Sequence, residues 1–304
     1  MTPEPTTQQT GERPGGAEPA GHTTARAARR VGRDTGLLMF GDVVDRGLGF
    51  AFLMVATKLY GLEIYGAYLI ALGLFQIVRA LVSFGLGRGL VKDAAAAVAV
   101  EDLGRLKGAI QLGFCLSLPI AIVCGLGLMF GAGEIVSIVF PTQLRIVEPI
   151  RVFGMLTPLF SFNFVLLQSL YGLGRIRDMV VANNIVEPTT RLVALVALFA
   201  TGMSGYYAIP GAYAVALVVS SLFAIYVFVR NVWPSLAGVR AVMRVRETLA
   251  FVVPITLNDL ATRSFKAFNI GVFAYFRTAV DVSIFNIALK LTGVAFFFSG
   301  SLMG

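Results

Sequence analysis

The stretch AIQLGFCLSLPIAIVCGLGLMF, residues 109–130, carries no charged residue. As an α-helix it would be about 33 Å long, which is enough to cross the roughly 30 Å of hydrocarbon in a lipid bilayer. Because backbone polar groups in lipid must be paired within one segment, such stretches must be helical. Comparable apolar stretches occur at 37–57, 66–90, 152–171, 180–201, 206–229, 249–276 and 280–303. We therefore predict an all-α polytopic membrane protein with eight transmembrane helices.

The composition of the whole chain agrees with this prediction and excludes other classes. Hydrophobic residues make up 57% of the chain and charged residues only 14%, whereas about 25% of a soluble globular chain is charged. The net charge of +8 could suit a nucleic-acid partner. The basic residues are, however, dispersed among apolar spans without a nucleic-acid-binding motif, so we expect no such partner. The single histidine, His22, lies in the polar N-terminal segment, and we expect no catalytic residue, metal or cofactor.

The polar segments between the spans predict the orientation and the domains. Residues 1–34 are rich in Pro, Gly, Thr and charge and lack an apolar period, which predicts disorder. Loops on the N-terminal side of the membrane carry 15 Lys and Arg and those on the other side carry 4. The positive-inside rule then places the N-terminus in the cytoplasm. The predicted parts are a disordered cytoplasmic tail (1–34), a six-helix lobe (35–231), a basic cytoplasmic linker (232–248) and two helices of a second lobe (249–304).

An offset of 217 residues reveals an internal repeat. It places Asp42 on Asp259 and Arg46 on Arg263, so two spans begin with Asp-x-x-x-Arg. The same offset aligns YGAYLIAL (65–72) with VSIFNIAL (282–289). These matches predict a repeated six-helix unit, and because six is even the two units are parallel. The second unit then holds only its first two helices, so we expect a truncated second lobe.

Charged residues inside the spans are the candidate functional residues, because a charge at the bilayer centre costs about 2.5–3.5 kcal/mol or more. Asp42, Asp45 and Arg46 share one helix face, and Asp259, Arg263 and Lys266 share another. We expect both faces to line one central cavity. The candidate substrate-binding residues are Arg46, Arg79, Arg263, Lys266 and Lys290, and the candidate coupling or charge-balancing residues are Asp42, Asp45 and Asp259.

The bases of this set outnumber its acids, which favours an anionic guest. Guanidinium groups suit phosphate oxygens because they donate a bidentate fork of hydrogen bonds. The alternative is structural: each aspartate only neutralises the arginine one turn further on. We interpret Glu187 and Arg191, which flank Pro188, as such an i,i+4 pair beside a proline kink.

Three stretches carry a resemblance to a known family. They are DRGLGFAFLMVATKLYGLEIYGAYLIALG (45–73), LQSLYGLGRIRD (167–178) and FVVPITLNDL (251–260). With them the chain resembles the polysaccharide flippases (Wzx-like proteins) of the multidrug/oligosaccharidyl-lipid/polysaccharide exporter superfamily. The resemblance implies two six-helix lobes, alternating access and a lipid-pyrophosphate-linked oligosaccharide as cargo. It also implies a cationic cavity at Arg46, Arg79, Arg263 and Lys266.

We therefore expect a flippase of the bacterial inner membrane that moves a polyprenyl-pyrophosphate-linked oligosaccharide for cell-surface polysaccharide biosynthesis. Its partners would be membrane lipids and a polysaccharide polymerase or glycosyltransferases. One alternative is a drug/cation antiporter of the same fold, which should prefer an acidic cavity. Another is a truncated, non-transporting scaffold of an envelope polysaccharide complex. A prenyltransferase, suggested by Asp42-x-x-Asp45, is disfavoured because Arg263 follows Asn258-Asp259 where a second acidic motif is needed.

Overall fold

The structure, a computed structural model, describes residues 20–302 apart from 84 and 141–143. The side chains of 20–31, 144, 259–260, 262–271, 273 and 293–302 lie outside the described residues. The described chain is almost entirely helical. Its elements are α1 (Ala20–Tyr60), α2 (Leu62–Ser83), α3 (Leu86–Ala99), α4 (Leu103–Val139), the 3₁₀ turn η1 (Leu144–Ile146), α5 (Val147–Gly172), α6 (Ile176–Val180), the π-helix η2 (Val181–Val186), α7 (Glu187–Ala200), α8 (Gly205–Asn231), α9 (Trp233–Leu236), α10 (Val245–Phe276) and α11 (Ala279–Leu302).

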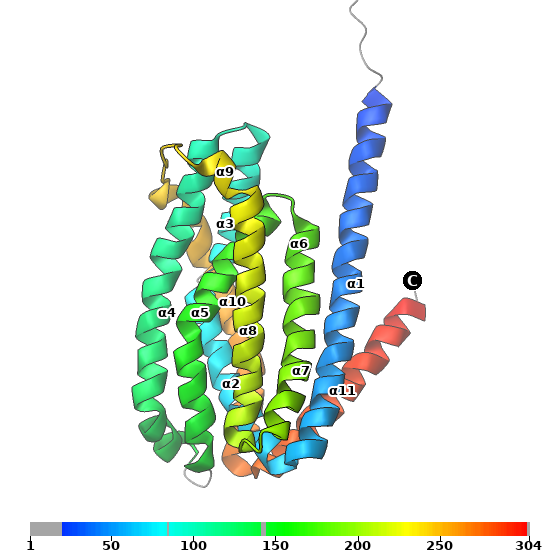
Figure 1. The fold of residues 1–304 in the computed structure, drawn as a ribbon, viewed down its shortest axis with the longest axis vertical. Coiled ribbons are helices and arrows are strands. Elements are labelled where there is room, and N and C mark those ends of the chain that lie inside the picture. Colours follow the sequence, from blue (N-terminus) through cyan, green and yellow to red (C-terminus); the bar gives the residue numbers. More distant parts are fainter. Residues whose placement is uncertain (1–19, 84, 141–143, 303–304) are drawn as a thin grey trace, which may run out of the picture.

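The helices form an elongated bundle (Figure 1). Its upper end in that view carries the α3–α4 turn and α9, and its lower end carries the α1–α2 and α10–α11 turns. α1 stands at one side, and α11 runs away from the bundle from the lower end. α10 packs along α2 and α3, while α11 packs on α2.

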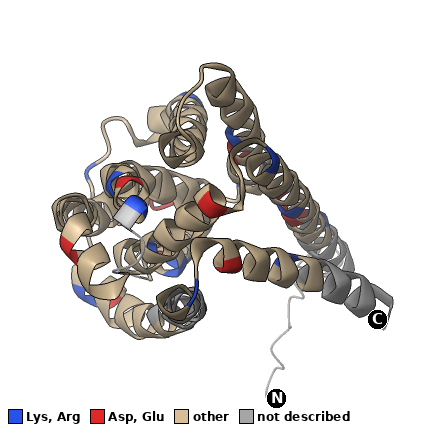
Figure 2. Cartoon of the chain, turned by 90° about the horizontal axis from the view of Figure 1, so that it is seen from below, with Lys and Arg blue, Asp and Glu red and all other residues tan. Residues whose placement is uncertain are grey.

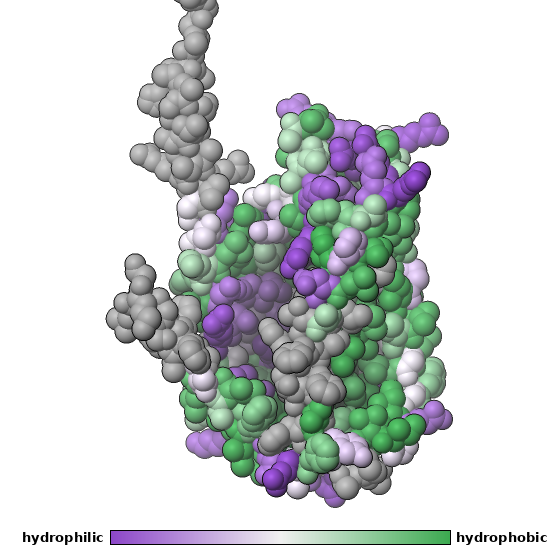
Figure 3. Space-filling model, turned by 180° about the vertical axis from the view of Figure 1, so that it is seen from behind, coloured by the Kyte–Doolittle hydropathy of each residue, from purple (hydrophilic) through white to green (hydrophobic). Residues whose placement is uncertain are grey.

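The expected all-α membrane fold is confirmed. Four segments of the described chain are long and apolar enough to cross a membrane: Leu62–Ala99, Leu103–Val139, Val147–Gly172 and Gly205–Asn231. Large apolar side chains such as Phe130 and Ile138 of α4 are exposed on the outside, as expected for a surface that faces lipid. Figure 3 shows such a hydrophobic surface over much of one face. The count of eight spans stays a prediction; the other four predicted spans fall on α1, α6–α7, α10 and α11.

Two boundaries differ from the sequence prediction. The predicted span 66–90 is divided, since α2 ends at Ser83 and α3 begins at Leu86. Gly85 has a φ of +55°, a conformation that suits glycine, and a Cβ there would meet the carbonyl oxygen of Val252 on α10. In addition, α1 begins at Ala20, inside the predicted tail 1–34. Residues 20–34 are rich in Ala and Arg, which are good helix formers.

The helix boundaries follow the predicted repeat. α1 ends at Tyr60 and α2 begins at Leu62, and the offset of 217 maps these positions onto 277 and 279. α10 ends at Phe276 and α11 begins at Ala279. The pair α10–α11 therefore reproduces the boundary of the pair α1–α2 to within one residue, as expected if the two pairs open equivalent units.

An aromatic core joins α2, α5 and α8 beneath the charged residues of the bundle. Phe75 stacks on Phe153 with ring centroids 4.8 Å apart, and Tyr213 meets both rings edge-on at 6.0 and 5.6 Å. Tyr68 and Phe160 extend the group. Such pairs contribute about 0.5–1.5 kcal/mol each beyond their burial. The core thus holds these three helices in a fixed relation around the candidate site.

Candidate functional site

Charged side chains from four helices interact with one another. We call this group the charged cluster; it consists of Asp42, Asp45 and Arg46 of α1, Arg79 of α2, Glu187 and Arg191 of α7, and Lys290 of α11. Figure 2 shows that basic and acidic positions are mixed along the helices, in keeping with mutual neutralisation. The charged cluster, as described, contains four basic and three acidic side chains.

Arg191 is at the centre of the charged cluster. Its Cζ lies 5.2 Å from the ring centroid of Phe52 and 5.7 Å from that of Tyr213, within the range of cation–π attraction. Its charge interacts with those of Glu187 and Asp45. The interpretation of Glu187 and Arg191 as a local pair was therefore incomplete, because the pair is joined to the acidic face of α1.

Arg79 approaches the same aromatic side chains from α2. Its Cζ lies 4.2 Å from the ring centroid of Phe160, and its Nη1 donates a hydrogen bond to the Tyr213 hydroxyl at 3.4 Å. The Nε atoms of Arg79 and Arg191 are both buried without a hydrogen-bond partner. Since a guanidinium has five N–H donors, both arginines retain donor capacity for an anionic ligand.

The acidic face of α1 is connected to η2 and to α11. Nδ2 of Asn184 donates to Oδ1 of Asp42 at 3.1 Å. Asp45 interacts electrostatically with Arg191 and with Lys290. Nζ of Lys290 in turn donates to the carbonyl oxygen of Gly49 at 3.4 Å. Lys290 thereby brings the first helix of the chain and the last described helix together at the charged cluster.

The π-helix η2 positions Asn184 and the residues that follow it. Its carbonyl at Ala182 accepts a hydrogen bond from Oγ of Ser220 at 3.2 Å, and Nδ2 of Asn163 donates to the same hydroxyl at 3.4 Å. These contacts tie η2 to α8 and α5. The signal in the sequence is Pro188, because a proline lacks the N–H that an α-helix would need there, and π-turns are frequent at functional sites.

The structure brings together most of the residues that the sequence singled out. Arg46, Arg79, Lys290, Asp42 and Asp45 all belong to the charged cluster. Arg191 and Glu187 are additional members. Asp259, Arg263 and Lys266 are positions of α10, but their side chains lie outside the described residues.

The surface around these helices is hollowed. Figure 3 shows a recessed group of hydrophilic residues at mid-height of an otherwise apolar face, on the side of the molecule opposite to the view of Figure 1. A polar recess at this depth is expensive in lipid unless water or a polar guest occupies it.

Residues 31–301 match the family described as polysaccharide biosynthesis protein. The chain belongs to this family. None of the curated proteins compared with this chain matches it. The match covers the charged cluster and both helices of the predicted second lobe, so the expected family resemblance is confirmed.

Two solved transporter structures share the fold of this chain. One is the inward-facing conformation of a multidrug resistance MATE family transporter of the MOP superfamily, with TM-score 0.62 and 18% identity. The match covers 84% of this chain and 57% of that one. The other is MATE in complex with Br-NRF, with TM-score 0.64, 20% identity and coverage of 86% and 61%. The chain thus spans about three-fifths of these transporters, and it shares their fold.

Proposed function

We propose that this chain is a flippase for a lipid-pyrophosphate-linked oligosaccharide. The observation that carries the proposal is the pair Arg79 and Arg191, whose buried Nε atoms lack partners beside the shared Tyr213. A pyrophosphate supplies several acceptor oxygens to such donors, and charge-assisted hydrogen bonds are about twice as strong as neutral ones. The matched family is described by its part in polysaccharide biosynthesis. In the proposed function, the sugar units for that biosynthesis are carried across the membrane on such a lipid.

The charges of the cluster suit reversible binding. With the site empty, Asp42, Asp45 and Glu187 balance most of the positive charge, which lowers the cost of holding arginines inside the membrane. When the pyrophosphate binds, it competes with these carboxylates for Arg79, Arg191 and Lys290. Either of two sources then drives the protein back to the conformation that binds cargo. One is proton uptake by the released aspartates, and the other is the membrane potential, at about 2.3 kcal/mol per charge per 100 mV.

The prenyl chain and the sugar have separate places in this proposal. The prenyl chain stays in the lipid beside α1, where Met39, Phe40 and Val43 expose apolar side chains. The sugar occupies the hydrophilic recess of Figure 3. The upper end faces the cytoplasm of a bacterium, so that cargo enters there and leaves at the lower end. A polymerase or glycosyltransferases supply and consume this cargo.

The decisive experiment is a flipping assay with the full chain in proteoliposomes and a polyprenyl-pyrophosphate oligosaccharide. Replacement of Arg46, Arg79, Arg263 or Lys290 by alanine is expected to reduce transport at least about tenfold, which corresponds to about 1.4 kcal/mol. Arg145→Ala is the control, because Arg145 is exposed at the lower end. Unchanged transport by the four variants would discard the cationic site.

A drug/cation antiporter is the second candidate. It is favoured by the MATE transporters among the matched structures and by the three carboxylates in the described cluster. The discriminating measurement is binding of pyrophosphate against binding of tetraphenylphosphonium to the purified protein, by calorimetry. Pyrophosphate binding that is lost in Arg79→Ala supports the flippase. Binding of the organic cation that is lost in Asp45→Asn supports the antiporter.

A further inference from the structure

A stretch rich in arginine joins α8 to α10 at the upper end of the bundle. We call residues 230–247, which include α9 and the non-helical chain after it, the basic segment. Figure 1 shows α9 at the top of the bundle, beside the α3–α4 turn. The segment contains four arginines against one acidic residue, Glu247, which is a net charge of +3. None of these residues belongs to the charged cluster, so the proposed transport function does not explain them.

Lys107 of α4 fixes the middle of the basic segment. Its Nζ donates hydrogen bonds to the carbonyl oxygens of Leu236 at 3.2 Å and Val239 at 2.9 Å. Gly238, between these two residues, has a φ of +83°, a conformation that favours glycine. The segment is thus attached to α4 through its own main chain, and this attachment leaves its side chains available for other contacts.

The next contact with α4 gives the depth of the basic segment in a membrane. The amide of Val242 donates to the carbonyl oxygen of Gly104 at 2.9 Å, and a Cβ on Gly108 would overlap the carbonyl oxygen of Val242. Both glycines lie directly before the charge-free stretch 109–130 of the α4 span. Headgroups add about 5–7 Å to each side of the hydrocarbon of a bilayer. A bilayer whose hydrocarbon covers 109–130 therefore has its headgroups at the level of Val242.

Apolar side chains of the basic segment are exposed at this level. Trp233 is 54% exposed, Val242 52% and Met243 45%. Trp233 is the only tryptophan of the chain. Tryptophan is enriched at membrane–water interfaces, where one part of the ring system meets acyl chains and the N–H reaches polar groups. Exposed apolar side chains beside arginines are typical of segments that lie in this interface.

All four arginines of the basic segment are exposed: Arg230, Arg240, Arg244 and Arg246. Nη1 of Arg230 donates to the hydroxyl of Tyr226 at 2.6 Å, and Nη1 of Arg244 donates to Oε2 of Glu247 at 3.2 Å. In the part of the chain that the structure describes, no acidic side chain forms an ion pair with Arg240 or Arg246. Their guanidinium groups are therefore available to an anion that approaches from outside.

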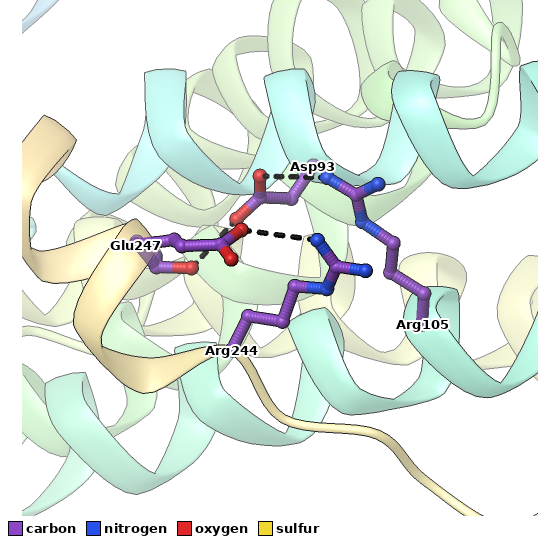
Figure 4. A network of polar contacts seen from close by, with 5 residues as sticks. Asp93, Arg105, Arg244 and Glu247 are labelled. Atoms are coloured by element: carbon purple, nitrogen blue, oxygen red, sulfur yellow. Dashed lines mark hydrogen bonds and ion pairs between the residues drawn. The ribbon is translucent and has the colours of Figure 1, made fainter.

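The acids beside the basic segment are bound elsewhere (Figure 4). Oγ1 of Thr248 donates to Oδ2 of Asp93 at 2.7 Å, and Nη2 of Arg105 lies 3.9 Å from Oδ1 of the same carboxylate. Asp102 caps α4, since its carboxylate accepts the amide of Arg105 at 2.9 Å. Even if the exposed Glu101 of the α3–α4 turn is counted with the basic segment, the surface stays positive. It therefore attracts anions.

We propose that the basic segment binds the phosphate groups of anionic lipids in the leaflet at the upper end of the protein. Trp233, Val242 and Met243 enter the border of the acyl chains. Arg240 and Arg246 donate to lipid phosphates, whose oxygens suit the guanidinium fork. A soluble acidic protein would match the charge but not the exposed tryptophan at headgroup depth. The proposal goes beyond transport, because the contact requires no cargo and no change of conformation.

The single tryptophan allows a test in the full chain without an added label. The protein is placed in lipid nanodiscs of phosphatidylcholine with a minor share of phosphatidylglycerol, and quenching of Trp233 fluorescence by brominated acyl chains is measured. In one sample the phosphatidylglycerol carries the bromine, and in the other an equal amount of phosphatidylcholine carries it. Both leaflets of a nanodisc have the same composition, so the result does not depend on the orientation of the chain.

We expect brominated phosphatidylglycerol to quench Trp233 at least about twofold more strongly than brominated phosphatidylcholine, because bases near the surface attract anionic lipids. This excess should shrink in about 1 M salt, where the Debye length falls to about 3 Å. Equal quenching by the two lipids would overturn the preference for anionic headgroups. Absence of quenching by both would place Trp233 in water, which also overturns the proposal and would indicate a soluble partner.

A double variant tests the two arginines directly. Arg240→Gln with Arg246→Gln is expected to lose the excess quenching by phosphatidylglycerol. Quenching by brominated phosphatidylcholine should remain, which would show that Trp233 keeps its place. The matched control is Arg145→Gln with Arg151→Gln, which removes the same charge from exposed positions at the lower end and should retain the excess.

Two outcomes of this comparison would contradict the proposal. If the excess persisted without Arg240 and Arg246, these arginines would not bind the lipid. If it disappeared in both double variants, it would reflect the net charge of the protein and not the basic segment. The flipping assay is a separate measurement, because its failure would reject the cargo and leave the quenching by anionic lipid unchanged.

Discussion

Gly66 of α2 lies so close to Ala279 of α11 that a methyl group on Gly66 would overlap the carbonyl oxygen of Ala279. The adjacent contact reverses the roles, since Oγ of Ser283 donates to the carbonyl oxygen of Leu62 at 2.6 Å. The offset of 217 maps Leu62 onto Ala279 and Gly66 onto Ser283. Reciprocal contacts of equivalent residues are what a twofold axis produces. This relationship supports a parallel repeat about an axis along the membrane normal.

The close approach at Gly66 predicts that a methyl group added at this position destabilises the protein more than one added at a glycine without a close neighbour. Gly66→Ala is expected to lower the free energy of unfolding by about 1–3 kcal/mol, because the backbone of α11 must move away. Thermal unfolding in detergent micelles measures the effect. Gly127→Ala is the control, since no atom lies within 4 Å of a Cβ placed there, and we expect a change within about 0.5 kcal/mol. Equal losses in both variants would contradict the contact.

Ser220 and Ser221 are adjacent and buried but have different partners. Ser220 joins Asn163 to the π-helix, whereas Oγ of Ser221 only donates to the carbonyl oxygen of Leu217 one turn earlier. Ser220→Ala should therefore cost about 1–3 kcal/mol of stability, because the buried Asn163 amide loses its partner. Ser221→Ala should cost less. Urea titration of both variants compares them, and adding Asn163→Leu to Ser220→Ala should restore part of the loss.

The pair Glu187 and Arg191 is expected to show strong energetic coupling. Replacing Arg191 by glutamine removes the positive charge that interacts most strongly with Glu187 and Asp45, and it should cost about 2 kcal/mol, somewhat less than the 3–5 kcal/mol of a fully buried pair. A double-mutant cycle with Glu187→Gln should give a coupling above about 0.5 kcal/mol.

The exposed pair Glu148 and Arg151, with Nη1 and Oε1 3.5 Å apart, is the control for this cycle. Solvent screening should keep its coupling at or below about 0.5 kcal/mol. If both cycles gave the same small coupling, Arg191 would not be a member of an interacting cluster in the membrane interior.

The orientation of the chain can be tested by thiol labelling. In a chain that carries Cys115→Ala and Cys124→Ala, a cysteine can replace Arg145 at the lower end or Arg240 between α9 and α10, and both positions are exposed. Because basic loops remain in the cytoplasm, an impermeant maleimide added to intact spheroplasts should label position 145 and not position 240. Labelling of position 240 alone in intact spheroplasts would show that the chain has the opposite orientation. In permeabilised cells, both positions should be labelled.

The sequence alone showed the helical membrane fold, the offset of 217 and five of the seven residues of the charged cluster. These features depend on local properties, since the length of an apolar run and the cost of a charge in lipid do not require a known neighbour. The register of Asp42, Asp45 and Arg46 on one face follows in the same way from the period of a helix.

The tertiary structure decided which faces meet. No sequence pattern showed that Arg191 would lie between Phe52 and Tyr213 or that α2 and α3 would divide at Gly85. Nor did any pattern show that the chain between α9 and α10 would pack on Gly104 and Gly108 of α4. A helical period gives the side of a helix on which a residue stands but not the helix that packs against it. That choice depends on close packing between segments far apart in the chain, where small residues such as Gly66 and Gly89 allow two backbones to touch.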